Sequence, residues 1–142
     1  MIKHNKLNNL YNLADERKYK VVNCDLTKLN QKGMVLEVDN KKSILIDYNR
    51  IETTAEETVI TAHEIGHAET DSLYKVNSSQ EEINRSEYQA TKWAVKNLIP
   101  FPEYLEALTN GIVEKWQLAE HFNVTEDFIL KTHYIYQCQG LI

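Results

Sequence analysis

The sequence contains only two cysteines, Cys24 and Cys138, which lie far apart and form no CxxC pair. So few cysteines speak against a disulfide-stapled fold. No apolar run approaches the roughly 18 residues that a membrane-spanning helix needs. The first residues also lack the apolar stretch of a signal peptide. These absences together predict a cytoplasmic protein that neither crosses a membrane nor depends on disulfides.

The sequence also has fewer basic than acidic residues: 16 lysines and arginines and 21 aspartates and glutamates, for a net charge of −5. This balance speaks against non-specific nucleic-acid binding as the main activity, since phosphates are bound largely through cations. The 142 residues suffice for one hydrophobic core, and no internal repeat or linker divides them. We therefore expect a single domain over residues 1–142, with no nucleic-acid partner.

The spacing of apolar residues predicts an α+β fold in which a small three-stranded sheet is packed with helices. Such a sheet is too small to stand without helices on one face. The expected strands are residues 21–26, 33–39 and 43–48, the last two forming a hairpin through a polar link at 40–42. The expected helices are residues 4–18, 55–70, 80–99 and 102–108, followed by two more in a tail at 111–137.

Capping signals mark the starts of two of these helices. Thr54 followed by Glu57, and Ser79 followed by Glu82, both fit the capping-box pattern. Gly66 interrupts the first of these helices, where glycine costs about 1 kcal/mol relative to alanine. We expect another element to approach closely at that position.

The chemistry of the chain centres on the stretch TAHEIGH, residues 61–67. On a helix, His63 and His67 lie one turn apart, so both rings can converge on one metal ion, and Glu64 can reach a water bound to that ion. Both histidines fall beside apolar residues on a helical wheel and are expected to point into the protein. The five-residue pattern is common by chance, and its alternative interpretation is a surface helix with two histidines.

A metal held by two histidines needs at least one further protein ligand. The next helix offers Glu81, Glu82 and Glu87, of which only Glu87 lies in the middle of the apolar stripe. A carboxylate buried in such a stripe must be paired, protonated or bound to a metal. The alternative is a salt bridge to Arg85 or Lys92, but neither shares its face of the helix. Glu87 is the predicted third ligand.

Residues 59–67 and 86–100 carry a resemblance to a known family, the ImmA/IrrE-type metallopeptidases of bacteria, their prophages and mobile elements. The second stretch resembles a family segment in which a glutamate is followed by an alanine three residues on, small apolar residues, then leucine and proline. That glutamate serves in the family as the third zinc ligand, and it falls on Glu87, in agreement with the wheel. The resemblance covers roughly residues 1–137.

The departures from the family pattern are mild. Lys92 and Trp93 stand where the family usually has an asparagine or arginine and a phenylalanine. A different class, the metzincins, would need a histidine six residues after His67, where this chain has Leu73. That class is excluded.

The resemblance implies a zincin-like core and a zinc-dependent endopeptidase. His63, His67 and Glu87 would hold Zn²⁺ (Mn²⁺ suits the same ligands), and Glu64 would be the catalytic base. The implied substrate is a protein, a helix-turn-helix repressor of a prophage or mobile element, paired with an edge strand of the sheet. The competing interpretation is a metal-holding antirepressor that inactivates its partner by binding, without hydrolysis. The oligomeric state is left open.

The tail at 111–137 resembles the helix-turn-helix that family members often show. It carries two lysines against four acidic residues, an unfavourable balance for a helix that reads DNA. We expect a helical pair that completes the core instead. In this interpretation Phe128 and Ile135 of its second helix pack against Trp116 and Phe122 of its first.

Overall fold

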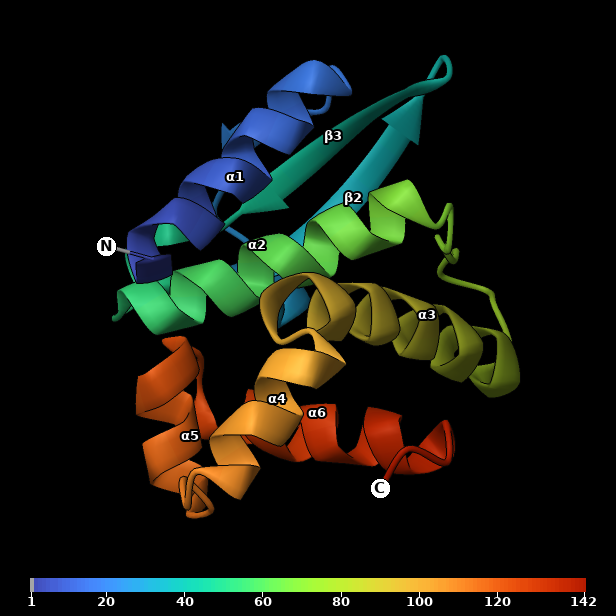
Figure 1. Cartoon of the computed structure of the whole chain (residues 1–142). Helices are drawn as coiled ribbons and strands as arrows, with labels where there is room; N and C mark the ends of the chain where they lie inside the picture. Colours follow the sequence, from blue (N-terminus) through green and yellow to red (C-terminus); the bar gives the residue numbers. More distant parts are fainter. Residues whose placement is uncertain (1) are drawn as a thin grey trace.

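The computed structural model describes the backbone of residues 2–142 and the side chains of residues 6–142 (Figure 1). It confirms the predicted α+β fold: a three-stranded sheet and six α-helices. The strands are β1 (Lys20–Asn23), β2 (Gly33–Val38) and β3 (Lys41–Ile46). The helices are α1 (Ile2–Glu16), α2 (Thr54–Glu69), α3 (Gln80–Leu98), α4 (Phe101–Thr109), α5 (Lys115–Phe122) and α6 (Glu126–Cys138). Short 3-10 turns, η1 (Thr27–Leu29) and η2 (Tyr48–Arg50), precede β2 and α2.

The sheet has the order β1-β3-β2, with β1 parallel and β2 antiparallel to the central strand β3. The predicted hairpin is confirmed, although its turn is shorter than expected. Asp39 and Asn40 form the turn with φ angles of 53° and 63°, and Lys41 already pairs with Val38. Two consecutive positive φ angles are typical of the tight hairpin turns whose twist matches that of the strands.

Strand β2 lies at the edge of the sheet and has a row of main-chain groups without a strand partner. The Asp47 amide donates to the Lys32 carbonyl at 2.9 Å, and hydrogen-bonded pairs alternate along an antiparallel ladder. The register pairs Gly33 with Ile46 and Met34 with Leu45. The alternation therefore directs the N–H and C=O groups of Gly33 away from β3.

The two helices that follow the sheet begin with side-chain caps, one of which lies a residue earlier than predicted. The cap of α2 is Thr53, whose hydroxyl accepts the Glu56 amide at 3.0 Å, so the predicted Thr54 cap is wrong. Both Thr53 and Thr54 are followed three residues later by a glutamate, so the local sequence does not show which of them is the cap. The predicted capping box at Ser79 and Glu82 is confirmed, with both reciprocal bonds present.

Helices α2 and α3 pack tightly where Gly66 meets Ala90. A Cβ atom added to Gly66 would lie 2.6 Å from the Ala90 carbonyl oxygen and 3.2 Å from its Cα. This close approach is the predicted reason for a glycine in the middle of a helix. It brings the faces of α2 and α3 that carry the candidate ligands within reach of each other.

The tail helices complete the core, as expected, with one exception. Leu118, Phe122, Phe128 and Ile135 are buried in the same apolar cluster as Ile44 and Ile46 of the sheet, and Thr125 caps α6 by accepting the Phe128 amide. Trp116 was expected in this packing, but it is 56% exposed. It lies in the first turn of α5.

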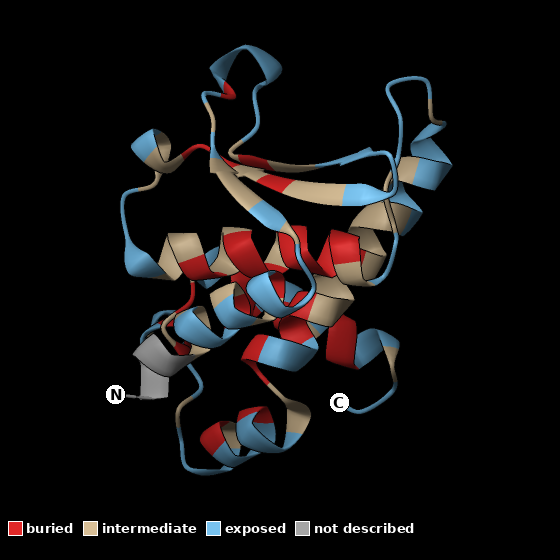
Figure 2. Ribbon diagram, turned by 90° about the horizontal axis from the view of Figure 1, so that it is seen from above, coloured by how far each residue is buried: buried red, intermediate tan, exposed pale blue. Residues whose placement is uncertain are grey.

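Buried positions gather where the sheet and the helices meet, and exposed positions cover the outer surfaces and the loops (Figure 2). Strand β3 shows the alternation of a half-buried sheet, because Ile44 and Ile46 are fully buried while Leu45 between them is only partly so. No helix of the described part of the chain is long and apolar enough to cross a membrane.

Candidate metal centre and active-site cleft

The two histidines of α2 project from the same side of the helix, one turn apart. Their ring centroids lie 4.7 Å apart and the rings are nearly perpendicular. The His67 side chain is buried, and that of His63 is partly buried. The spacing of four residues on a helix therefore brings both rings to one point below the surface.

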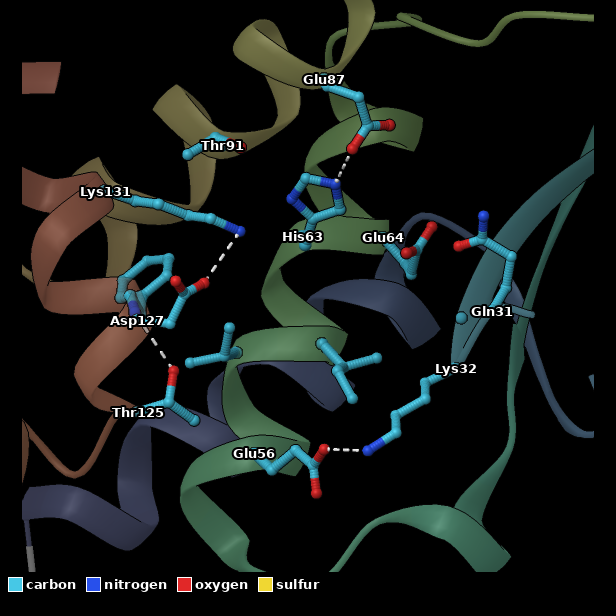
Figure 3. A pocket seen from close by; sticks show the side chains of 14 residues that line it. Gln31, Lys32, Glu56, His63, Glu64, Glu87, Thr91, Thr125, Asp127 and Lys131 are labelled. Atoms are coloured by element: carbon cyan, nitrogen blue, oxygen red, sulfur yellow. Dashed lines mark hydrogen bonds and ion pairs between the residues drawn. The ribbon is translucent and has the colours of Figure 1, made fainter. Parts of the chain in front are cut away.

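Glu87 reaches both histidines from α3, and Figure 3 shows its contact with His63. Its Oε1 lies 3.0 Å from His63 Nε2, and its Oε2 lies 2.9 Å from His67 Nε2. One donor atom from each of the three residues lies within 4.8 Å of the others. Within the described residues, this is the one group of three or more such side chains with the separations of a metal site.

The other carboxylates and cations of α3 have different partners. Glu82 accepts the Ser79 amide in the capping box, and Glu81 pairs with Arg85 at 3.5 Å on the exposed side of the helix. The Lys92 ammonium lies over the Tyr88 ring, 5.7 Å from its centroid. The structure therefore joins Glu87 to the histidines and to neither Arg85 nor Lys92.

The expectation that Glu87 is buried is wrong, because its side chain is 42% exposed. The wheel correctly places it on the face that turns toward α2. That face, however, borders a cleft at Glu87 and becomes buried only from Ala90 onward. A helical wheel gives the direction of a side chain but not the place where the neighbouring element ends.

The surroundings of these side chains favour positive charge between them. Burial alone would raise the pKa of Glu87, but the hydrogen bonds and charges of His63 and His67 hold it well below its usual range. Burial alone would lower the pKa of His67, but its hydrogen bond to Glu87, the Glu64 charge and the Ser72 carbonyl raise it overall. A cation at this point, whether a proton or a metal ion, meets an ionised carboxylate.

Ser72 fixes the orientation of the His67 ring. The Nδ1 atom of His67 lies 2.7 Å from the Ser72 carbonyl oxygen. A carbonyl oxygen only accepts, so Nδ1 carries the proton and Nε2 is the atom that faces Glu87. A hydrogen bond of this kind from the far nitrogen is typical of metal-binding histidines. Sequence reasoning missed Ser72, because a loop carbonyl has no residue-type signal.

Glu64 lies beside the histidines in a nearly buried position and lines the cavities on both sides of them. Burial raises its pKa, and the charges of His63 and His67 lower it in part. A glutamate with a raised pKa is suited to accept a proton and release it again near neutral pH. Gly33 of β2 approaches it closely, since a Cβ there would lie 2.9 Å from Glu64 Cγ.

Tyr74, in the loop between α2 and α3, is a second residue that sequence reasoning did not single out. Its ring centroid lies 6.2 Å from that of His67, in an edge-to-face arrangement, and the residue lines a cavity with Glu64 and Glu87. Burial and the Glu87 charge raise the pKa of Tyr74, so its hydroxyl keeps its proton and remains a donor. The sequence contains eight tyrosines, and nothing in their local pattern distinguishes this one.

Two cavities, of about 400 and 340 Å³, extend from the site in opposite directions along the elements that form it. Both are lined by Gly33, His63, Glu64 and Glu87. On α2, the larger cavity continues toward Glu56 and the smaller toward His67. The two cavities therefore form one cleft that passes through the candidate metal centre. Helix α6 contributes a wall of the larger cavity, which the sequence did not predict.

Comparison with known families gives one match. A peptidase family model described as "IrrE N-terminal-like domain" matches residues 14–133, which include His63, Glu64, His67 and Glu87. No curated protein and no solved structure matches the chain.

Proposed function

Because the chain belongs to the peptidase family of IrrE N-terminal-like domains, we propose that it is a zinc-dependent endopeptidase with His63, His67 and Glu87 as its metal ligands. The family is of the metallopeptidase type, as the sequence resemblance implied. The observation that carries the proposal is the convergence of three donor atoms within 4.8 Å, beside Glu64 and inside a cleft. The whole chain, residues 1–142, is proposed to act as one domain.

The donor set suits zinc. Two imidazole nitrogens and one carboxylate are a common set in catalytic zinc sites, which keep a fourth position open. Glu87 Oε1 lies 3.0 Å from His63 Nε2 and Oε2 lies 2.9 Å from His67 Nε2, so the three side chains that would hold the ion face one another. Manganese accepts the same ligands and is the alternative metal.

The reaction divides into a Lewis-acid part and a proton-transfer part. A zinc ion at this site supplies polarisation of the scissile carbonyl and lowers the pKa of water toward about 7. Glu64 accepts the proton of the attacking water and passes it to the leaving amine. Tyr74 donates its hydroxyl hydrogen to the carbonyl oxygen as negative charge develops there. Ser72 keeps the His67 ring in its productive orientation.

The substrate is proposed to be an extended segment of a protein. The free main-chain groups of β2 can pair with such a segment by β-augmentation, next to Glu64. By the family resemblance, the protein is a helix-turn-helix repressor of a prophage or mobile element, cleaved in the cytoplasm to relieve repression. The tail helices α5 and α6 are proposed to bind no nucleic acid.

Glu64→Gln tests the proposal, because glutamine keeps the size and hydrogen bonding of glutamate but does not accept the proton. Cleavage of the proposed helix-turn-helix repressor substrate is expected to fall by roughly 10²-fold or more. Zinc content, measured by metal analysis, should stay at that of the wild type. Glu81→Gln, an exposed glutamate on α3, is the matched control and should cleave normally.

Two results would change the proposal. Equal cleavage by wild type and Glu64→Gln would remove Glu64 from the mechanism. A wild type that cleaves nothing with zinc or manganese, yet still releases the repressor from its operator, would replace the endopeptidase with an antirepressor that acts by binding.

A further inference from the structure

The two halves of the cleft differ in the number of charged side chains that line them. Beyond the residues that they share, the smaller cavity is lined mainly by apolar side chains, together with His67 and Lys75, and we call it the apolar half. Its apolar lining includes Leu29, Met34, Val35, Tyr74, Val76 and Ile83. The larger cavity is the charged half. It contains some apolar residues and, in addition, Lys32, Glu56, Asp127 and Lys131.

The charges of the charged half are paired with one another (Figure 3). Lys32 Nζ lies 2.6 Å from Glu56, and Lys131 Nζ lies 3.4 Å from Asp127. An apolar side chain bound there would have to displace water from these ion pairs, at a cost in desolvation. The charged half is therefore suited to polar side chains.

The rim of the apolar half carries large apolar side chains that remain in contact with solvent. Leu29, beside β2, is 58% exposed, Tyr74 is 41% exposed, and Val76 is fully exposed. They come from two separate loops and line the same cavity. Apolar residues that gather around a cavity indicate a binding surface, whereas single exposed ones are ordinary.

The loop that carries Leu29 is held in place by the core. The buried Asp47 carboxylate accepts the Leu26 amide at 3.0 Å and the Arg50 guanidinium at 2.9 Å. The Leu29 amide in turn bonds to the Leu26 carbonyl at 3.0 Å. The part of the rim that carries Leu29 is thus held in place by the core, which lowers the entropic cost of binding there.

A peptide paired with β2 would cross from one half of the cleft to the other at Glu64. Lys32, just before the strand, lines the charged half, and Met34 and Val35 line the apolar half. Gly33 lies between them and lines both, in close contact with Glu64. The two sides of the bond at Glu64 therefore face different surroundings.

We infer that the cleft selects protein segments with a large apolar residue on one side of the scissile bond, bound in the apolar half, and tolerates polar residues on the other. The inference rests on the proposed endopeptidase function and names the substrate feature that this site recognises. Burial of one large apolar side chain is sufficient for strong selection, since its transfer from water to apolar surroundings can raise the binding affinity tenfold or more.

The test uses the full chain with Glu64→Gln, loaded with zinc, so that binding is measured without hydrolysis. The probes are fluorescent octapeptides of serine and threonine that differ at one position, which is phenylalanine or aspartate. By fluorescence anisotropy, the phenylalanine peptide is expected to bind roughly tenfold or more tightly than the aspartate peptide. Leu29→Asp should lower this ratio severalfold, and Leu105→Asp should leave it unchanged. Leu105, on α4, is similarly exposed at 43% and lines neither cavity.

A second pair of variants keeps the test valid if Leu29→Asp fails to fold. Val76→Asp should lower the ratio as well, whereas Val113→Asp, at an exposed site outside both cavities, should not. With the wild type, mass spectrometry should find the phenylalanine peptide cut always on the same side of the phenylalanine.

Three results would overturn the inference: equal affinity for the two peptides, no detectable binding of either, or an unchanged ratio in both Leu29→Asp and Val76→Asp. Its failure is distinguishable from that of the proposed function. Selective binding to Glu64→Gln without any cleavage by the wild type would refute the peptidase and leave the selectivity standing. Cleavage by the wild type, with equal affinity of Glu64→Gln for the two peptides, would refute the selectivity and leave the peptidase standing.

Discussion

At the scale of single residues, the candidate centre depends on one carboxylate that comes from a different helix than the histidines. Glu87→Ala removes the carboxylate that lies within 3.0 Å of both rings, whereas Glu81→Ala removes an exposed one. We expect purified wild type to hold about one zinc ion per chain. Titration against a chromophoric chelator should show at least tenfold weaker zinc affinity in Glu87→Ala and no change in Glu81→Ala. Equal retention of zinc in both variants would contradict the ligand assignment.

Gly33→Ala tests the contact between β2 and Glu64. An added methyl group would lie 2.9 Å from Glu64 Cγ, 3.1 Å from its Oε2 and 3.0 Å from Ile60 Cγ2, so the glutamate has to move. A displacement of about 1 Å at a catalytic group can lower the rate by roughly 10²-fold. We expect strongly reduced cleavage, with zinc affinity close to that of the wild type because none of the three proposed ligands is touched. Cleavage at the wild-type rate would show that Glu64 adapts without loss.

Local spacing explains which residues of the centre were visible in the sequence. His63, Glu64 and His67 follow from helix geometry alone, and the wheel gave the direction of Glu87 although not its exposure. Contacts made by backbone or by irregular segments have no such period. Ser72, Tyr74 and Gly33 reach the site through a loop and a strand, and their positions depend on the folded chain. No pattern of residue types within ten positions of them indicates this role.

At the scale of secondary structure, the separation of α2 and α3 is set by Gly66. Gly66→Ala gains about 1 kcal/mol of helix propensity but places a methyl group 2.6 Å from the Ala90 carbonyl oxygen. Overpacking of this kind costs about 1–3 kcal/mol, and a backbone atom yields less easily than a side chain. We therefore expect a net loss of up to about 2 kcal/mol in the free energy of unfolding by urea. Zinc affinity should fall too, because Glu87 moves with α3. A gain in stability would show that the helices separate freely.

Helices and strands were predictable from the sequence because each has its own apolar period, and their ends were not. Thr53 and Thr54 offer the same capping pattern one residue apart, and only the folded structure selects Thr53. The pairing of β1 with β3 in parallel also has no signal in either strand, since it depends on a crossover through β2. The hairpin was visible because its two strands are adjacent in the chain.

At the scale of the whole molecule, the tail links the core to the cleft. Its apolar side chains, Phe128 and Ile135 among them, lie in the same cluster as those of the sheet. Its polar side chains Asp127 and Lys131 line the charged half of the cleft. The first role was predictable from helical spacing. The role of the tail in lining the cleft was not predictable, because it requires α6 to lie beside α3, which is distant in the sequence.

The charge of the tail bears on whether this protein binds DNA. A helix-turn-helix holds duplex DNA through lysines and arginines that contact phosphates, and its affinity falls steeply as salt rises. From Gly111 on, the chain has two lysines, and each lies beside a carboxylate that offsets its charge: Lys115 lies 3.7 Å from Glu126, and Lys131 lies 3.4 Å from Asp127.

We therefore predict no duplex binding above background at about 0.1 M salt, measured by gel shift with the operator of the proposed repressor substrate. The repressor itself is the positive control, since it should shift the same duplex. Lys115→Ala and Lys131→Ala should each leave the result unchanged, because two lysines among four acidic residues are too few to hold a duplex. Tight, sequence-dependent binding that Lys115→Ala abolishes would contradict the prediction and turn α5 and α6 into a DNA-reading pair. In that event the α6 side chains Asp127 and Lys131 would contact the duplex, and they could not at the same time line the charged half of the cleft.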